Sequence, residues 1–332
     1  MSRPNPHMLT IETADQAPER FKAWREAGLF GIDRTSVGVL RDYYPAAFAQ
    51  THRDATFAIL NQDTPLAIVP ATIGDACLDY FKQPLRFFYG GDLSAEMVDC
   101  AFAHIDSLVT ALTLRGVAIR DDEIASRLSV LGKACLNRKY CPAIRLTALA
   151  DLRDGEAGLR RGLRKSFKSL LNWGKANLEL RYVDAANPDR ALFDRYHQFH
   201  VHTAGRATRS QDSWDAMYAL IAAGRGELVL GFLPGDVLVA GTMVFDARGS
   251  AHYVSGVYDR ERFDKPMAHW PLWIAMLRAY ERGQTLFELG EVPAEGTASA
   301  KDVSIGYFKR GFATEISTAL VWRWTDPVSP AA

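Results

Sequence analysis

Apolar and polar positions along the first half of the chain predict strands and helices in turn. Two runs rich in β-branched residues, 56–60 and 66–73, flank the polar segment 61–64 and predict a β-hairpin. A short aromatic run follows at 85–91. Ser94 then stands where an N-cap begins a helix of regularly spaced apolar residues that ends at Gly116. Residues 117–120 predict a short buried strand.

The second half repeats this order of elements. Residues 226–259 predict three strands, separated by polar turns at 234–236 and 247–250. Pro266 suits the first turn of a helix whose apolar part, 270–277, leads to a stop at Gly283. Further strands are expected at 285–290 and 315–324. Two copies of a hairpin, a helix and a strand indicate a duplicated α/β domain, which we divide into residues 1–157 and 158–332.

The most basic segment lies between the two halves. Apolar residues from Leu159 to Leu171 recur at the positions of one helical face, which predicts one amphipathic helix. Like charges four residues apart on its other side repel, so an anion such as a phosphate, a nucleotide or an RNA backbone would stabilise this face. A solvated face that contacts acidic loops is the alternative. The cations concerned are Arg160, Arg161, Arg164, Lys165 and Lys168.

Composition narrows the classes of function. Lysine plus arginine (39) equals aspartate plus glutamate (39), so binding of nucleic acid would depend on a local patch rather than on the overall field. No run reaches the roughly 18 apolar residues of a membrane-spanning helix, and the first residues lack the apolar core of a signal peptide. The four cysteines are far apart, with no C-x-x-C pair, and fit neither a zinc knuckle nor a disulfide scaffold. We therefore expect a cytoplasmic protein without a membrane span.

Several catalytic motifs are absent from the sequence. It contains no P-loop, no G-x-G-x-x-G turn and no G-x-S-x-G elbow. The R-x-x-G-x-G/A pyrophosphate loop of ordinary acetyl-CoA-dependent N-acetyltransferases is also missing. Three histidines, His197, His200 and His202, are close enough in sequence to suggest zinc. No acid stands at ligand spacing, however, so surface or core histidines are favoured over a zinc hydrolase, and we expect no metal.

The clearest chemical signal lies near the C-terminus. A strand predicted to end at Gly290 leads through a polar loop to residues 306–312, where Lys309 stands between Phe308 and Phe312. Open α/β sheets place ligands just outside their strand ends. An ammonium group there can stabilise the oxyanion of an acyl transfer, or a phosphate. A lysine that packs its stem on aromatic rings and extends its charge into solvent is the alternative.

At this point several segments of the second half, taken in order, resemble the FemABX family of peptidoglycan-precursor aminoacyltransferases and its FemAB-like relatives. The first half fits by architecture alone. The resemblance implies an α/β fold with two tandem GNAT-like domains, each a mixed sheet flanked by helices. The matching segments are the basic helix with its strand (163–180), a segment ending in T-x-x-R (199–206), a helix and strand (210–232), a hairpin (237–259), a second helix and strand (270–291) and the signature FKRGF (308–312).

The resemblance also implies roles for individual residues. The signature lysine at the reacting centre corresponds to Lys309, beside Phe308, and the anion-contacting arginine to Arg206. Tyrosines of the central strand correspond to Tyr253 and Tyr258. Two positions depart from the family pattern: Ala313 stands where glycine is usual, and Glu288 where aspartate is usual.

The activity that the resemblance implies is transfer of an acyl group to an amine of a cell-envelope precursor. The donor would be aminoacyl-tRNA or acyl-CoA, with no tightly bound cofactor. The acceptor would be a peptidoglycan peptide or an amino sugar, either a small molecule or lipid-linked. Lys309 would supply the countercharge to the oxyanion, while Glu288, Glu291 or the acceptor's own phosphate would act as base. The alternative is an inactive scaffold that binds RNA or an anionic glycolipid. The oligomeric state is open.

Overall fold

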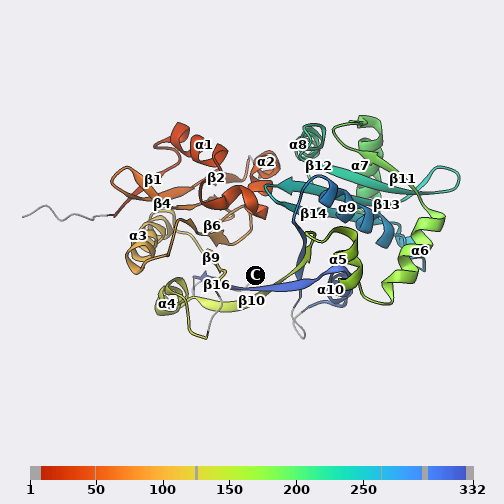
Figure 1. Cartoon of the computed structure of the whole chain (residues 1–332). Coiled ribbons are helices and arrows are strands. Elements are labelled where there is room, and N and C mark those ends of the chain that lie inside the picture. Colours follow the sequence, from red (N-terminus) through yellow and green to blue (C-terminus); the bar gives the residue numbers. More distant parts are fainter. Residues whose placement is uncertain (1–8, 49, 124–125, 263, 294–297, 327–332) are drawn as a thin grey trace, which may run out of the picture. The chain divides into compact units, whose positions relative to one another are not determined.

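The structure is a computed structural model, which describes residues 9–48, 50–123, 126–262, 264–293 and 298–326 (Figure 1). The chain forms two compact units. Unit 1 comprises Met1–Ile32, Phe48–Arg145 and Thr318–Ala332, and unit 2 comprises Asp33–Ala47 and Leu146–Ser317. These ranges differ from the division at 157/158 because two long strands, β10 (Cys141–Asp151) and β16 (Glu315–Thr325), each contribute residues to both units.

Among the described residues, unit 1 is built from short strands and the helices α1, α3 and α4. Its four-stranded sheet has the order β1-β3-β4-β8, and β9 pairs with β6, β7 and β16. The predicted hairpin is present as β3 and β4, joined by a two-residue turn in which Gln62 has φ 56°. The elements are β1 (Leu9–Thr13), α1 (Pro18–Glu26), η1 (Leu29–Arg34), β2 (His52–Asp54), β3 (Phe57–Asn61), β4 (Thr64–Val69), β5 (Thr72–Gly74), β6 (Cys77–Asp79), β7 (Leu85–Arg86), β8 (Phe88–Tyr89), α3 (Ala95–Leu112), β9 (Gly116–Asp121) and α4 (Val130–Asn137).

The helix expected after Ser94 is confirmed, because the Ser94 side chain accepts a hydrogen bond from the Met97 N–H at the start of α3. It ends before Gly116, at Thr113, which adopts the left-handed conformation. Alternate residues of β3 reach different cores. Phe57 and Ile59 pack with α3, whereas Ala58, which lies between them, packs with α1. Helices thus cover both faces of this sheet.

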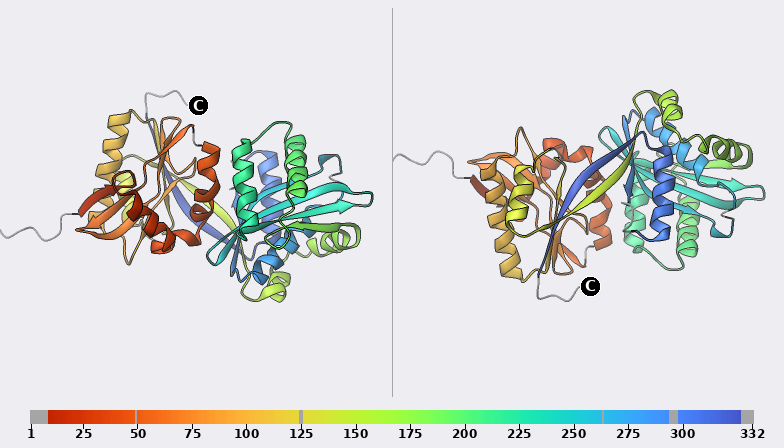
Figure 2. Two further views of the ribbon diagram at one scale, coloured as in Figure 1. Left: turned by 90° about the horizontal axis from the view of Figure 1, so that it is seen from above. Right: turned by 90° about the horizontal axis from the view of Figure 1, so that it is seen from below.

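Unit 2 is a mixed sheet of order β11-β12-β13-β14-β15-β10. Leu228 and Leu230 of β12 face one core with α7 and α8, and Val229 between them faces another with α5, α6 and α9 (Figure 2). The mixed α/β fold with sheets flanked by helices is therefore as predicted. The elements are α2 (Ser36–Phe48), α5 (Gly155–Gly162), α6 (Phe167–Asn177), β11 (Glu179–Val183), α7 (Arg190–Ala204), α8 (Gln211–Ala222), β12 (Gly226–Leu233), β13 (Val237–Ala247), β14 (Ser250–Tyr258), η2 (Arg260–Arg262), α9 (His269–Glu281), β15 (Leu286–Val292) and α10 (Ala300–Phe312).

Three local expectations are wrong. The second run of the first hairpin divides into β4 and β5, which belong to different sheets. Helix α9 begins at His269, so Pro266 precedes it and does not lie in its first turn. Strand β15 continues past Gly290 to Val292. Among the described residues, no helix is both long and apolar enough to span a bilayer.

The predicted single amphipathic helix is also wrong, because the structure has two helices, α5 and α6, separated by residues 163–166. Leu163 is extended at the break (φ −63°, ψ 130°), and the Arg164 N–H donates to the Gly311 carbonyl oxygen at the end of α10. The apolar stripe is nevertheless buried as predicted, with Leu159 and Phe167 at 1% and 3% exposure. A tertiary hydrogen bond thus replaces one turn of helix.

A buried ion network fixes the C-terminal end of α9 to the sheet. Glu227 on β12 is completely buried, and its carboxylate lies 2.5 Å from Arg278 Nε and 2.7 Å from Arg282 Nη1. Each guanidinium has a second carboxylate, Asp184 for Arg278 and Asp246 for Arg282, both at 2.7 Å. A buried carboxylate needs such partners, since desolvation costs several kcal/mol.

We expect Glu227→Gln to lower the free energy of unfolding by about 3 kcal/mol, because two guanidinium groups lose their shared buried counterion. Urea unfolding followed by circular dichroism measures this. Glu156→Gln, which breaks the exposed Arg160–Glu156 pair, is the matched control and should cost less than about 0.5 kcal/mol. Equal effects of the two substitutions would contradict the role of the network.

Candidate functional site

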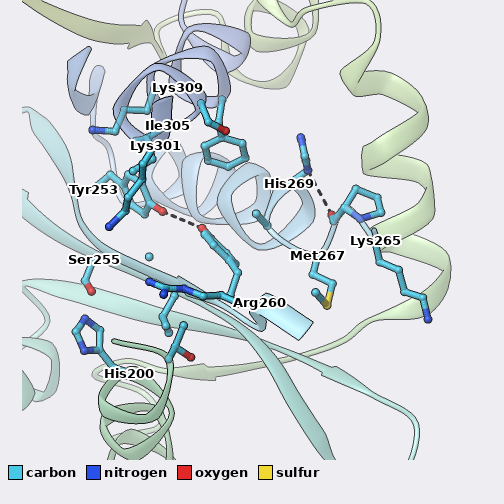
Figure 3. A pocket seen from close by; sticks show the side chains of 18 of the residues that line it. His200, Tyr253, Ser255, Arg260, Lys265, Met267, His269, Lys301, Ile305 and Lys309 are labelled. Carbon is cyan, nitrogen blue, oxygen red and sulfur yellow. Dashed lines mark hydrogen bonds between the residues drawn. The ribbon is translucent and has the colours of Figure 1, made fainter. Parts of the chain in front are cut away.

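Unit 2 contains a cavity of about 1120 Å³ (Figure 3). Its walls come from the second half of β14, the loop before α9, the C-terminal end of α7 and the inner side of α10. The cavity exists because β14 and β15, which run parallel, pair only from Ser250 with Leu286 to His252 with Glu288. Beyond these three pairs each strand carries a bulge, at Val254 and at Leu289.

Lys309 extends from α10 to the bulge of β15. Its Nζ donates to the Glu291 carbonyl oxygen at 3.0 Å. Gly290 makes this approach possible: its φ is +91°, and a Cβ there would lie 3.1 Å from Lys309 Nζ. Burial lowers the pKa of Lys309, and the Glu291 and Glu288 carboxylates partly offset that effect. The ammonium therefore lies at the edge of the cavity, beside the backbone of β15.

Two tyrosines of β14 meet in the cavity through their hydroxyl groups. The Tyr253 and Tyr258 oxygens are 2.8 Å apart, and Tyr258 is 3.3 Å from Thr242 Oγ1 on β13. The ring of Tyr253 lies across Gly256, where a Cβ would come within 1.7 Å of the Tyr253 hydroxyl oxygen. Gly256 thus leaves the space that the phenol occupies.

The proton count of this hydroxyl chain leaves one donor for a ligand. Burial raises the pKa of Tyr253 and of Tyr258, so both phenols stay protonated at neutral pH. Three hydroxyls carry three protons, and the two hydrogen bonds between them use two. The third proton, which lies on Tyr253, Tyr258 or Thr242 according to the direction of the two hydrogen bonds, remains available to donate.

Three further cations line the cavity, and the sequence analysis did not single them out. They are Arg260, Lys265 and Lys301. In Figure 3 the side chain of Arg260 extends into the cavity, toward Ser255, whereas the side chain of Lys265 points away from the cavity. Arg260 and Lys265 belong to the loop that precedes α9, and the first residue of that helix also lines the cavity. Positive groups at a helix N-terminus favour anions. Acids interleaved in this loop, at 259, 261 and 264, hid the signal in the sequence.

The three histidines of α7 do not converge. His197 stacks on the Trp214 indole (4.4 Å between ring centroids), while His200 meets the same indole edge-on and lines the cavity. Burial and the Arg209 guanidinium lower the pKa of His200 to about 4. His202 is exposed. In the described ranges no three potential ligands form a metal-binding group, so nothing here supports a zinc hydrolase.

A fourth histidine, His269, begins α9 and lines the cavity among aromatic rings. Its ring centroid lies 4.6 Å from that of Phe167 and 5.1 Å from that of Phe308. Burial lowers the pKa of His269 to about 4. Phe308 itself lines the cavity and packs on Phe312. Of the two phenylalanines of FKRGF, Phe308 therefore belongs to the wall of the cavity, and the buried Phe312 packs behind it.

Of the residues singled out from the sequence, the structure brings Lys309, Phe308, Tyr253 and Tyr258 together around the cavity. Arg206 follows the end of α7 and is exposed, and Thr203 of the same T-x-x-R match lines the cavity instead. Glu288 and Glu291 do not line the cavity. The Glu288 carboxylate lies 3.4 Å from His252 Nδ1, and Glu291 meets Lys309 through its carbonyl oxygen.

The five cations of residues 160–168 do not line the cavity either. Arg160 and Arg161 pair with Glu156 and Asp154, which lie upstream in the sequence, so their mutual repulsion is largely offset within the fold. Arg164 donates to the Tyr307 carbonyl oxygen and lies over the Tyr307 ring. Lys165 and Lys168 are exposed.

Comparison with known proteins identifies the fold. Residues 157–301 match the family model of the acetyltransferase (GNAT) domain. FemX aligns with a TM-score of 0.61 over 86% of this chain and 91% of its own, at 11% identity. A tandem GNAT protein from the clavulanic acid biosynthesis pathway gives 0.59 over 98% and 100%, at 14% identity.

The chain has a tandem GNAT fold. Its second unit contains the segment that the GNAT family model matches, and the FemX-like arrangement expected from the sequence is present. The C-terminal domain of a putative lysylphosphatidylglycerol synthetase from Agrobacterium fabrum has the same fold, with a TM-score of 0.53 over 78% of this chain and 81% of that one, at 14% identity. A search of the curated proteins finds no match.

The two half-buried histidines of the GNAT cavity predict a loss of stability in acid. Imidazoles of the unfolded chain titrate near 6.5, whereas the pKa of His200 and of His269 is about 4 in the folded protein. Between these values the unfolded state binds more protons, so the free energy of unfolding falls as the pH falls from about 6.5 to about 4. In the double variant His200→Gln, His269→Gln, urea unfolding at several pH values should show a shallower fall.

The exposed His202→Gln is the control for this measurement and should leave the slope unchanged. A double variant with the slope of the unchanged protein would show that other groups govern its acid sensitivity.

Proposed function

We propose that the cavity of unit 2 is the active site of an N-acyltransferase that moves an acyl group from an activated donor to an amine. The observation that carries this proposal is that Lys309, Tyr253 and Tyr258 line one cavity beside the point where β14 and β15 part. A carbonyl placed there would face an ammonium and a phenolic proton, which are the groups that stabilise charge on oxygen during acyl transfer.

The reaction follows from these groups. The neutral acceptor amine attacks the donor carbonyl carbon, a C–N bond forms, and negative charge develops on the carbonyl oxygen. Lys309 supplies the countercharge. When the intermediate collapses, the bond from carbon to the donor's sulfur or oxygen breaks. The leaving atom takes a proton from Tyr253, which regains one from the attacking nitrogen, so protons balance over the cycle.

The donor is proposed from the cations of the cavity. Arg260 and Lys301, together with the N-terminal end of α9, suit a phosphate group near the activated acyl. Acyl-CoA and aminoacyl-tRNA both have that chemistry. The match to an acetyltransferase family model supports the first, and the fold of FemX and of the lysylphosphatidylglycerol synthetase domain is compatible with the second.

The acceptor is proposed to be an amine of a cell-envelope precursor. Support comes from two relatives in fold, FemX and a putative lysylphosphatidylglycerol synthetase, whose names connect this architecture with envelope components. A cavity of about 1120 Å³ is large enough for a donor end and an acceptor end together.

Lys309→Met should lower kcat by about 10²- to 10³-fold with little change in stability, because the thioether keeps the length of the side chain but removes its charge. Steady-state transfer of a radiolabelled acyl group measures the loss. Lys175→Ala, an exposed lysine of α6, should leave kcat unchanged. Near-normal turnover of the Lys309 variant would overturn the assignment of Lys309 to the reaction.

Arg260→Ala and Lys301→Ala should each weaken donor binding by about tenfold, since each removes one charge-assisted contact to phosphate. Calorimetric titration with acetyl-CoA and, separately, with aminoacyl-tRNA distinguishes the two donors. The exposed Lys133→Ala in unit 1 is the control. If neither donor binds the unchanged protein, the proposed function fails. If one binds equally well to all variants, the phosphate lies elsewhere.

A further inference from the structure

The cavity of unit 2 has two chemically different sides. In Figure 3 Tyr253, Lys301 and Lys309 lie on one side, and Met267 and His269 lie on the other. The first side presents a hydroxyl and two ammonium groups. The second presents a thioether and an imidazole that lies among aromatic rings. The reaction proposed above uses groups of the polar side, so the apolar side remains to be assigned.

A row of rings leads from the reacting groups into the apolar side. The Tyr258 hydroxyl is hydrogen-bonded to Tyr253, and the Tyr258 ring lies edge-on to Phe308, at 6.3 Å between centroids. Phe308 in turn lies edge-on to His269, at 5.1 Å. Leu170 of α6 also lines the cavity and packs against the same core as Phe308. We define the apolar wall as Tyr258, Phe308, His269 and Leu170.

The apolar wall is uncharged at neutral pH. Burial lowers the pKa of His269 to about 4, so its imidazole is neutral. The Nδ1 proton of that ring is donated to the Pro266 carbonyl oxygen, at 3.3 Å. Among the described residues that line the cavity, Asp264 is the only acid, and it is exposed. The wall therefore suits an apolar group and holds no countercharge for a cationic one.

We propose that the apolar wall binds the acyl group of the donor, and that the donor is an acyl-CoA whose acyl chain is apolar and longer than acetyl. The carbonyl carbon that faces Lys309 and Tyr253 carries this chain directly, so the chain leaves the reacting centre along a surface that begins there. The wall does so, because Tyr258 is the hydroxyl partner of Tyr253. The phosphates of CoA would lie on the side of Arg260 and Lys301. This inference rests on the proposed function and selects one of its two donors.

An aminoacyl ester suits this cavity less well. Its ammonium group is attached to the carbon next to the reacting carbonyl, where Lys309 supplies a charge of the same sign. The carboxylates that act on Lys309, those of Glu288 and Glu291, do not line the cavity. Like charges repel more strongly in a concave site of low dielectric constant than in water. An apolar chain avoids this repulsion and gains contact with the wall.

Donors of increasing chain length test the proposal. From acetyl-CoA through butyryl-CoA to hexanoyl-CoA, kcat/KM should rise about fourfold for each methylene that the wall buries. Release of the CoA thiol, with glucosamine as the acceptor, measures this. Equal kcat/KM for the three donors, or transfer from aminoacyl-tRNA alone, overturns the proposal. A preference that follows the chain of the acceptor, hexylamine over methylamine, would assign the wall to the acceptor and would also overturn it.

Variants of Leu170 show whether the wall sets the preference. Leu170→Ala removes apolar surface and should lower the ratio of kcat/KM for hexanoyl-CoA to that for acetyl-CoA about tenfold. Leu170→Trp fills the same space and should make butyryl-CoA a better donor than hexanoyl-CoA. Leu136→Ala, which truncates a leucine that is 52% exposed in unit 1, is the matched control and should leave the ratio unchanged. Impaired folding would lower both values together, so a ratio that neither Leu170 variant changes overturns the proposal.

Binding of inert analogues separates this inference from the proposed function. S-hexyl-CoA, a thioether without a carbonyl group, should bind the full-length protein at least tenfold more tightly than S-methyl-CoA in a calorimetric titration. If it does so but no acyl group reaches an amine, the apolar wall stands as a binding site and the proposed activity fails. If acetyl is transferred while chain length changes neither binding nor rate, the activity stands and this inference fails.

Discussion

The site of unit 2 depends on two parallel strands that stop pairing. A parallel ladder normally continues with evenly spaced hydrogen bonds, yet β14 and β15 hold each other over three residue pairs and then diverge. Backbone groups that leave a ladder need other partners. The carbonyl oxygen of Glu291 accepts a hydrogen bond from the Lys309 ammonium. The ammonium can approach because Gly290, which is in the left-handed conformation, has no Cβ there. The same opening gives Tyr253 space to lie across Gly256. The residues of the proposed active site are therefore placed where the pairing of these two strands ends.

An opening of this kind needs a rigid frame, and α9 supplies it. The helix starts at the cavity with His269 and ends at the buried network around Glu227. Since Arg278 and Arg282 are both held by that carboxylate, the helix is attached to β12 at the end remote from the chemistry. Movement at the cavity end would have to strain buried charge pairs. The network that stabilises the fold thus also holds the helix whose first residue lines the cavity.

Local signals in the sequence were sufficient for much of the fold. The N-cap at Ser94 and the turn between β3 and β4 are set by neighbouring residues, and so are readable without tertiary structure. The break between α5 and α6 was not readable, because it depends on a hydrogen bond from Arg164 to Gly311, nearly 150 positions away. Lys309 was found through a short motif. Arg260 was missed because acids beside it in the sequence cancel its charge there, while in the fold its side chain lines the cavity.

The distribution of charge resolves the apparent conflict between a neutral chain and an anionic donor. The most basic run in the sequence, 160–168, is partly neutralised in the fold, since Arg160 and Arg161 have acidic partners. Among the described residues, Arg260 and Lys301 have no ion-pair partner, and both extend into one cavity from two separate segments. A field focused in a concave, partly apolar site attracts an anion more strongly than the same charges spread over a surface. Zero net charge is therefore compatible with a phosphate-bearing donor, because the field that matters is local and is assembled by the fold.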